Sequence, residues 1–203
     1  MLPLFHRIYW KLGMDFEIKD NFLIGAKQQL SPNSSDRINE HDISLLIIHN
    51  ISLPPGVFGT GYVDQFFCNN LDPKIHPYFK KISELRVSTH LLVSRAGDVT
   101  QYVALNRKAW HAGDSIFKGR KNCNEFSIGI ELEGTDHEAF TDMQYETLIY
   151  VTKELLKNYP LINRNRIKGH SDIAPGRKTD PGPYFEWQKY FDGLEEVQNS
   201  KSK

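Results

Sequence analysis

The chain has 203 residues, of which 39% are hydrophobic and 12% aromatic; this excludes a disordered chain and suits one globular domain with a buried core. Its 25 basic and 25 acidic residues give a formal net charge of zero, which argues against a general affinity for nucleic acid or for an anionic membrane. The two cysteines, Cys68 and Cys123, are too few for a disulfide-stabilised secreted domain and form no CxxC motif, so we expect free thiols in a reducing compartment.

The N-terminus is partly apolar, but basic side chains interrupt it. Because no continuous apolar segment with a cleavage site follows, we expect neither a signal peptide nor a membrane-spanning segment, and therefore a cytoplasmic protein. Met14 is a second candidate start. We expect residues 1–20 to be an N-terminal extension, residues 21–195 to form a single domain, and residues 196–203 to be a polar tail.

The first half of the domain contains a strand, a short helix and a hairpin. Residues 43–48 are almost continuously apolar and lead to His49, which suits a central strand buried on both faces. A loop with two prolines and a glycine follows, and residues 62–70 predict a short helix. The β-rich segments 90–94 and 99–103 flank the turn sequence Arg-Ala-Gly-Asp and predict a hairpin.

The second half of the domain combines strands with longer helices. Residues 126–133 alternate strictly between apolar side chains and Ser, Gly or Glu, as in a strand with one apolar face. Residues 142–159 predict a long helix, because apolar side chains recur at spacings of three and four after a Thr-x-x-Gln capping box. We expect a short strand at 167–169 and a final short helix starting near Pro183. The fold class is therefore α/β of the mixed α+β type, with a central mixed β-sheet flanked by helices.

Three parts of this sequence carry candidate ligands or catalytic groups. They are His49 at the end of the buried strand, Glu131 on the polar face of the alternating strand, and the Pro- and Gly-rich segment that contains His170 and Asp180. A catalytic zinc ion commonly takes three protein ligands and keeps a fourth position for water. His49, His170 and Asp180 would form such a site for one zinc ion; the alternative is that His49 is simply a packed or hydrogen-bonded histidine.

Two further side chains suit hydrolysis at such a centre. Glu131, in a cleft beside a metal-bound water, could act as general base; the alternative is an exposed strand carboxylate, as we would assume for Glu133. Lys178, two residues before Asp180, could stabilise an oxyanion; the alternative is a solvated loop lysine. The sequence contains neither G-x-S-x-G nor HExxH, so these parts favour metal-assisted hydrolysis by another arrangement.

With these residues in view, the sequence closely resembles the AmpD family, the 1,6-anhydro-N-acetylmuramyl-L-alanine amidases of cell-wall recycling. The likeness spans about residues 20–190, and several long blocks in the same order are more specific than any single motif. The blocks are residues 49–56, 85–88, 109–113, 124–136 and 170–183. The resemblance implies the amidase and peptidoglycan-recognition-protein fold, with zinc in a cleft on one side of the sheet.

The resemblance also assigns roles. It implies that one zinc ion binds to His49, His170 and Asp180, and that the catalytic groups are Glu131 and Lys178. It further implies a substrate cleft lined by Asn50, Arg86, Trp110 and His111.

Two of these substrate contacts have ordinary alternatives. Arg86 could pair with a peptide carboxylate through two hydrogen bonds, or with a neighbouring surface carboxylate. Trp110 could offer a flat face to a sugar, or belong to the core.

The implied reaction is zinc-dependent hydrolysis of the amide between the lactyl group of (1,6-anhydro-)N-acetylmuramic acid and L-alanine, by a monomer acting on soluble anhydro-muropeptides, with no nucleic-acid or membrane partner. One alternative is an exported or wall-directed N-acetylmuramoyl-L-alanine amidase, which the missing signal peptide disfavours. Another is a non-catalytic peptidoglycan-binding module, which the full set of ligands and Glu131 disfavours. A phage-type endolysin would usually carry a separate wall-binding module, for which the chain has no room.

Overall fold

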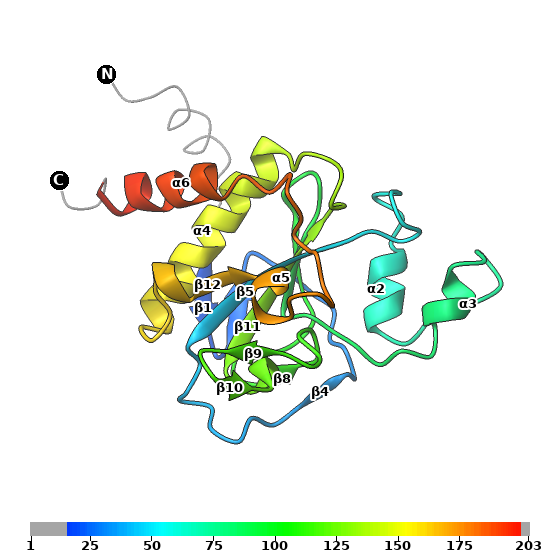
Figure 1. The fold of residues 1–203 in the computed structure, drawn as a ribbon, viewed down its shortest axis with the longest axis horizontal. Helices are drawn as coiled ribbons and strands as arrows, with labels where there is room; N and C mark the ends of the chain where they lie inside the picture. The colour runs from blue at the N-terminus through cyan, green and yellow to red at the C-terminus, as the bar shows by residue number, and fades with distance from the viewer. Residues whose placement is uncertain (1–15, 200–203) are drawn as a thin grey trace.

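The computed structural model describes residues 16–199, and a six-stranded sheet lies at its centre (Figure 1). In spatial order its strands are β12 (Ile167–Gly169), β5 (Leu45–Ile51), β11 (Ser127–Glu133), β6 (Leu91–Val93), β7 (Val99–Gln101) and β3 (Lys27–Gln28). The first four strands are parallel, β6 and β7 form an antiparallel hairpin, and β3 is parallel to β7. The predicted mixed sheet and its hairpin are confirmed.

Smaller elements surround this sheet. Three two-stranded ladders in the described chain pair β1 (Glu17–Lys19) with β2 (Phe22–Ile24), β4 (Ser34–Ser35) with β8 (Lys108–Ala109), and β9 (Ile116–Phe117) with β10 (Arg120–Lys121). The helices are α2 (Tyr62–Phe67), α3 (Phe79–Ile82), α4 (Asp142–Asn158), α5 (His170–Ile173) and α6 (Trp187–Asn199), with the 3₁₀ turns η1 (Cys123–Glu125) and η2 (Arg164–Arg166). None of the helices in residues 16–199 has the length and apolarity needed to cross a membrane.

The long helix α4 covers one face of the sheet, and α6 packs against α4 on the same side (Figure 1). Its predicted capping box is present: Thr141 accepts a hydrogen bond from the backbone of Gln144, whose side chain accepts one from the backbone of Thr141. Leu148 and Leu155 of its apolar stripe are fully buried in the main core, and Leu156 packs partly buried against it. The 3,4 spacing therefore predicted correctly which side of α4 faces the sheet.

The opposite face of the sheet carries the polar residues of interest. Leu45 and Ile47 of β5 pack there against the segment around Phe117 and Phe126 and against α5. Since side chains alternate along a strand, His49 emerges on this same face. Glu131 of β11 lies directly beside it, because the parallel register pairs these two residues.

All seven residues of β11 are buried. Its polar face is therefore covered by loops, and Glu133 is not the exposed strand carboxylate that the alternation suggested. Alternation along a strand reports which residues share a face, but it does not report what covers that face.

The chain ends differ from the predicted boundaries. β1 lies inside the stretch expected to be an extension, and Ile18 packs against the main core. Met14 lies outside the described residues. The final helix starts at Trp187 rather than near Pro183, because Phe185 turns into the core and its backbone bonds to Gly182. α6 then continues to Asn199, so the predicted polar tail begins within this helix.

Candidate metal centre and cleft

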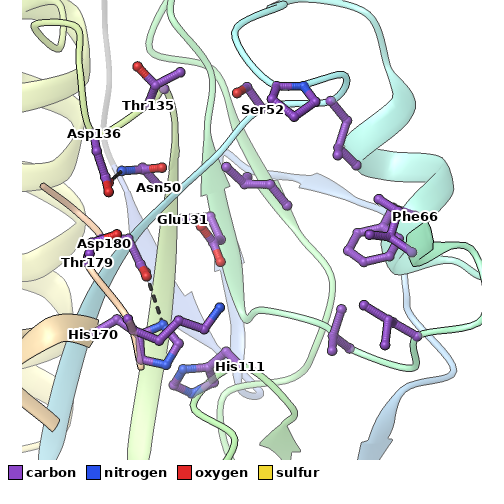
Figure 2. Close-up of a pocket in the computed structure, with 18 of the residues that line it drawn as sticks. Asn50, Ser52, Phe66, His111, Glu131, Thr135, Asp136, His170, Thr179 and Asp180 are labelled. Atoms are coloured by element: carbon purple, nitrogen blue, oxygen red, sulfur yellow. Dashed lines mark hydrogen bonds and ion pairs between the residues drawn. The ribbon is translucent and has the colours of Figure 1, made fainter. Parts of the chain in front are cut away.

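The three predicted ligands meet at the carboxyl ends of parallel strands. His49 lies near the end of β5, and His170 opens α5 directly after the neighbouring strand β12. The Nδ1 atoms of His49 and His170 lie 3.0 Å apart, and each lies 3.0 Å from Oδ2 of Asp180. Figure 2 shows Asp180 and His170 facing each other at the floor of the cleft.

This geometry suits a small cation. Three donor atoms that lie 3.0 Å from one another are close enough to share one zinc ion, whose usual ligand distances are about 2.0–2.1 Å. The imidazoles are almost fully buried and the Asp180 side chain is 14% exposed. His49, His170 and Asp180 therefore form a possible metal site.

The electrostatics favour the ligand forms of these groups. Burial lowers the pKa of His49 to about 4, although its hydrogen bond with Asp180 opposes this shift. Burial alone would raise the pKa of Asp180, but the hydrogen bonds with His170 and His49 outweigh it and hold this pKa below its ordinary value. At neutral pH a neutral imidazole thus faces an ionised carboxylate, the protonation states that metal binding requires.

Glu131 is a buried carboxylate next to this cluster. It is 9% exposed, and its Oε2 atom has no hydrogen-bond partner among the described residues. Burial raises its pKa well above the ordinary value, the negative charge of Asp180 adds to this, and the positive charge of Lys178 opposes it. An unpaired buried carboxylate of raised pKa that lines a cleft is typical of a general base.

The cleft above these residues has a volume of about 580 Å³. Glu131, His170 and Asp180 lie along one side of it, and Phe66 of α2 lies opposite (Figure 2). Lys178 is also among the lining residues. No hydrogen bond or ion pair within residues 16–199 restrains the ammonium group of Lys178, so this exposed cation is available to a bound molecule. A cleft of this size admits a ligand of drug size or a small peptide conjugate.

Three of the four predicted substrate contacts, Asn50, Trp110 and His111, line the cleft. Asn50 and Trp110 also donate structural hydrogen bonds. Asn50 donates from Nδ2 to Oδ1 of Asp136 at 2.7 Å and to the carbonyl of Pro181 at 3.1 Å. Trp110 donates from Nε1 to the hydroxyl of Ser35 at 3.2 Å.

Arg86 and His111 are placed differently from these two. The side chain of Arg86 is 47% exposed, donates to the carbonyl of Ser83 at 3.1 Å and lies 3.8 Å from Glu84; its neighbours along the chain line the cleft, whereas Arg86 is not among the lining residues. His111 lines the cleft but is only 9% exposed, and its Nδ1 lies 2.9 Å from Nε2 of His49. The substrate roles of these two residues remain predictions.

The structure also brings in residues that the sequence did not single out. Ser127, Gly129 and Asn124 surround His111, and Asp136 holds Asn50. Local patterns carry little signal for such contacts, because their partners lie up to 86 residues away along the chain. The sequence offered one signal for Ser127 and Gly129: strict alternation places them on the same strand face as Glu131.

Together, the fold and the site define a class of protein: a mixed-sheet hydrolase with a possible metal centre and a carboxylate at the carboxyl ends of its parallel strands. The sequence model of the N-acetylmuramoyl-L-alanine amidase family matches residues 39–183. This match contains every predicted site residue from His49 to Asp180.

Individual relatives narrow the class. The 1,6-anhydro-N-acetylmuramyl-L-alanine amidase AmpD of Haemophilus influenzae is 53% identical over 178 residues, covering 88% of this chain and 97% of that protein. A crystal structure of an AmpD derivative superposes with a TM-score of 0.85 at 48% identity, over 87% of this chain and 98% of that chain. The chain belongs to the AmpD family of N-acetylmuramoyl-L-alanine amidases.

A more distant structure carries a ligand. The amidase AmiD from Escherichia coli, in complex with the substrate anhydro-N-acetylmuramic acid-L-Ala-D-γ-Glu-L-Lys, matches with a TM-score of 0.56 at 26% identity, over 88% of this chain and 65% of that chain.

Proposed function

We propose that this protein hydrolyses the amide between the lactyl group of 1,6-anhydro-N-acetylmuramic acid and L-alanine in soluble muropeptides, as a step of cell-wall recycling. The reaction uses one zinc ion held by His49, His170 and Asp180. The domain is that of residues 21–195, and the enzyme acts as a cytoplasmic monomer.

The observation that carries this proposal is the unpaired oxygen of Glu131 beside three converging ligand atoms, at a cleft that Glu131, His170 and Asp180 line. The names of the AmpD relatives and the substrate seen in the AmiD complex supply the chemical class of the ligand. A non-catalytic peptidoglycan-binding module would not need a buried carboxylate of raised pKa at this position.

The chemistry is divided among a few groups. When bound at the three ligand atoms, zinc would lower the pKa of a water molecule towards about 7 and polarise the scissile carbonyl. Glu131 accepts the proton of the attacking water through Oε2 and then delivers it to the amine nitrogen of L-alanine, so that the leaving group departs neutral. The ammonium group of Lys178 stabilises the negative charge that develops on the carbonyl oxygen.

The remaining residues position the substrate. Asn50 and Trp110 line the cleft next to the reacting atoms, with Trp110 offering its ring to the sugar. Arg86 reaches the stem-peptide carboxylate only if its guanidinium leaves Ser83 and Glu84, which we expect on binding.

The test is a direct incubation of the purified protein with anhydro-N-acetylmuramyl-tripeptide, followed by mass spectrometry. We expect free tripeptide and free anhydro-sugar, loss of this activity with a chelator, and its return with zinc. A parallel incubation with polymeric sacculi distinguishes the wall-directed alternative, because only a wall-directed amidase should release peptides from them efficiently. Absence of cleavage of both substrates by the zinc-loaded protein would contradict the proposal.

A further inference from the structure

To bind a metal ion, the imidazoles of His49 and His170 must lie close together and must also be in the right tautomer. Each must present a bare Nδ1 to the ion, so each must carry its proton on Nε2, and the partner of Nε2 decides this. Both partners come from one short segment, because His49 contacts the side chain of His111 and His170 contacts the carbonyl of Ala112.

We propose that the segment His111–Ala112 is a positioning device that sets the tautomer and ring orientation of both histidine ligands. His111 acts through its contact with His49 and is therefore a positioning residue. This inference rests on the proposed function and deepens it, because it assigns a role to residues behind the metal centre.

On the Ala112 side, Nε2 of His170 lies 3.1 Å from the carbonyl oxygen of Ala112 and 3.4 Å from Nη2 of Arg177, so the shorter contact is the one with an acceptor. A carbonyl oxygen can only accept, so the contact of 3.1 Å between Nε2 of His170 and this carbonyl places the proton on Nε2 and leaves Nδ1 bare. The same carbonyl accepts a second hydrogen bond, from Nη2 of Arg177 at 2.6 Å. Both of its lone pairs are thus in use, which holds the carbonyl in place.

On the His111 side, His49, His111 and Ser127 form a chain of hydrogen bonds in which each imidazole donates from Nε2 to the next residue. For Nδ1 of His49 to be bare, its Nε2–H must donate to Nδ1 of His111 at 2.9 Å. Nε2–H of His111 then donates to the hydroxyl of Ser127 at 3.2 Å. A ring that donates from Nε2 keeps Nδ1 as its accepting nitrogen, so His111 can serve both partners at once.

Gly129 makes room for this chain. A Cβ atom at this position would lie 2.5 Å from Nδ1 of His111 and 2.6 Å from its Cγ, so the imidazole lies directly on the backbone of β11. Any larger residue there would push away the ring on which His49 depends. The glycine in the alternating strand thus has a packing reason.

Asn124 holds the segment itself. Its Oδ1 accepts hydrogen bonds from two successive backbone amides, those of His111 at 3.1 Å and Ala112 at 2.8 Å. One side chain in η1 therefore positions both the imidazole that serves His49 and the carbonyl that serves His170. Loss of this amide should loosen both ligands together.

The test compares two substitutions of His111 with a matched surface control. His111→Leu keeps an apolar volume but removes the acceptor for His49, whereas His111→Asn retains an oxygen near the position of Nδ1. His41→Leu makes the same chemical change at an exposed histidine remote from the centre. For each protein we would measure zinc affinity by chelator competition without substrate, then kcat and KM at saturating zinc.

We expect His111→Leu to weaken zinc binding by about 10–100-fold, the usual effect of losing such a partner of a ligand, and to lower kcat with KM unchanged. His111→Asn should recover most of the affinity, and His41→Leu should match the wild type. Nitrogen-15 spectra of the histidines should show both ligands protonated at Nε2 in the zinc-loaded wild type. Unchanged zinc affinity in His111→Leu, or a raised KM as its only effect, would overturn the inference in favour of a substrate contact.

The outcome stays informative if His111→Leu does not fold. Asn124→Ala then takes its place, with an expected loss of zinc affinity of about 10-fold; wild-type affinity in that variant would overturn the inference. Because zinc affinity is measured without substrate, an inactive but zinc-binding wild type would contradict the proposed function alone. An active wild type with an unaffected variant would contradict this inference alone.

Discussion

Replacing Glu131 with glutamine should stabilise the zinc-free protein while removing its activity. In the folded, zinc-free chain this carboxylate is 9% exposed, one of its oxygens has no partner among the described residues, and burial together with the charge of Asp180 raises its pKa. The ionised form is therefore disfavoured by folding. The neutral amide of Glu131→Gln has the same shape without that charge.

The direction with pH follows from proton linkage. Between the ordinary pKa of 4.5 and the raised pKa of the folded state, the folded protein binds more protons than the unfolded one, so this group makes the protein less stable as pH rises. The Glu131→Gln variant does not lose stability in this way, because its amide does not ionise. Its advantage over the wild type should be absent below pH 4.5 and complete above the raised pKa.

The magnitude follows from what the substitution removes. The amide of the variant is also unpaired, so only the additional cost of a charge disappears, about 1 kcal/mol. In a domain of this size that corresponds to a rise in Tm of about 2–4 °C. Activity should fall by about 10²–10⁴-fold, the usual contribution of a general base.

The assay is thermal unfolding of the zinc-free protein at several pH values, with Glu133→Gln as the matched control. Glu133 lies on the same face of β11 and is equally buried, but its two oxygens accept from the backbone of Gly59 at 2.5 Å and of Arg95 at 3.2 Å. Glu133→Gln loses one of these bonds and should be destabilised by about 1.5–3 kcal/mol. A Glu131→Gln variant that is no more stable than the wild type at pH 8, or one that remains fully active, would refute the reasoning.

Four further predictions concern the metal, the lysine and the core. Zinc at 100 times its Kd should raise the free energy of unfolding by about 2.7 kcal/mol, seen by calorimetry with and without chelator; an unchanged Tm would argue against the site. Lys178→Met should lower kcat by about 10²–10³-fold and leave zinc affinity intact, whereas normal turnover would remove this lysine from the mechanism. Leu148→Ala, in the core-facing stripe of α4, should cost about 2–5 kcal/mol in urea unfolding; a cost below that of a surface substitution would contradict the packing. Thr141→Ala should cost about 1 kcal/mol through loss of the capping box, and Thr141→Ser should restore most of it.

Local sequence patterns predicted the elements whose cause is local. The capping box and the 3,4 spacing placed α4 from Asp142, where the structure begins it, and strict alternation predicted β11. In both cases the responsible side chains are neighbours on one helix face or one strand face. The final helix was predicted too early, because the inward turn of Phe185 depends on a core built by distant segments.

The candidate ligands show the same division. Their residue types and their family resemblance could be recognised from the printed chain, but no local pattern states that His49 and His170, 121 residues apart, lie 3.0 Å from each other. The parallel order of β12, β5 and β11 decides that, by aligning the carboxyl ends of three strands.

The sequence by itself determined the chemical inventory: two histidines, two carboxylates and a lysine, within segments whose periodicity defines a mixed sheet with helices. Only the tertiary structure decided which of these groups are buried, which face a partner and which remain unpaired. Glu131 and Glu133 are the same residue type on the same face of the same strand. Glu133 accepts hydrogen bonds from two backbone amides, whereas Glu131 keeps an oxygen without a partner among the described residues. The physical reason is that hydrogen bonding and desolvation depend on what folds over a residue, and those covering loops come from elsewhere in the chain.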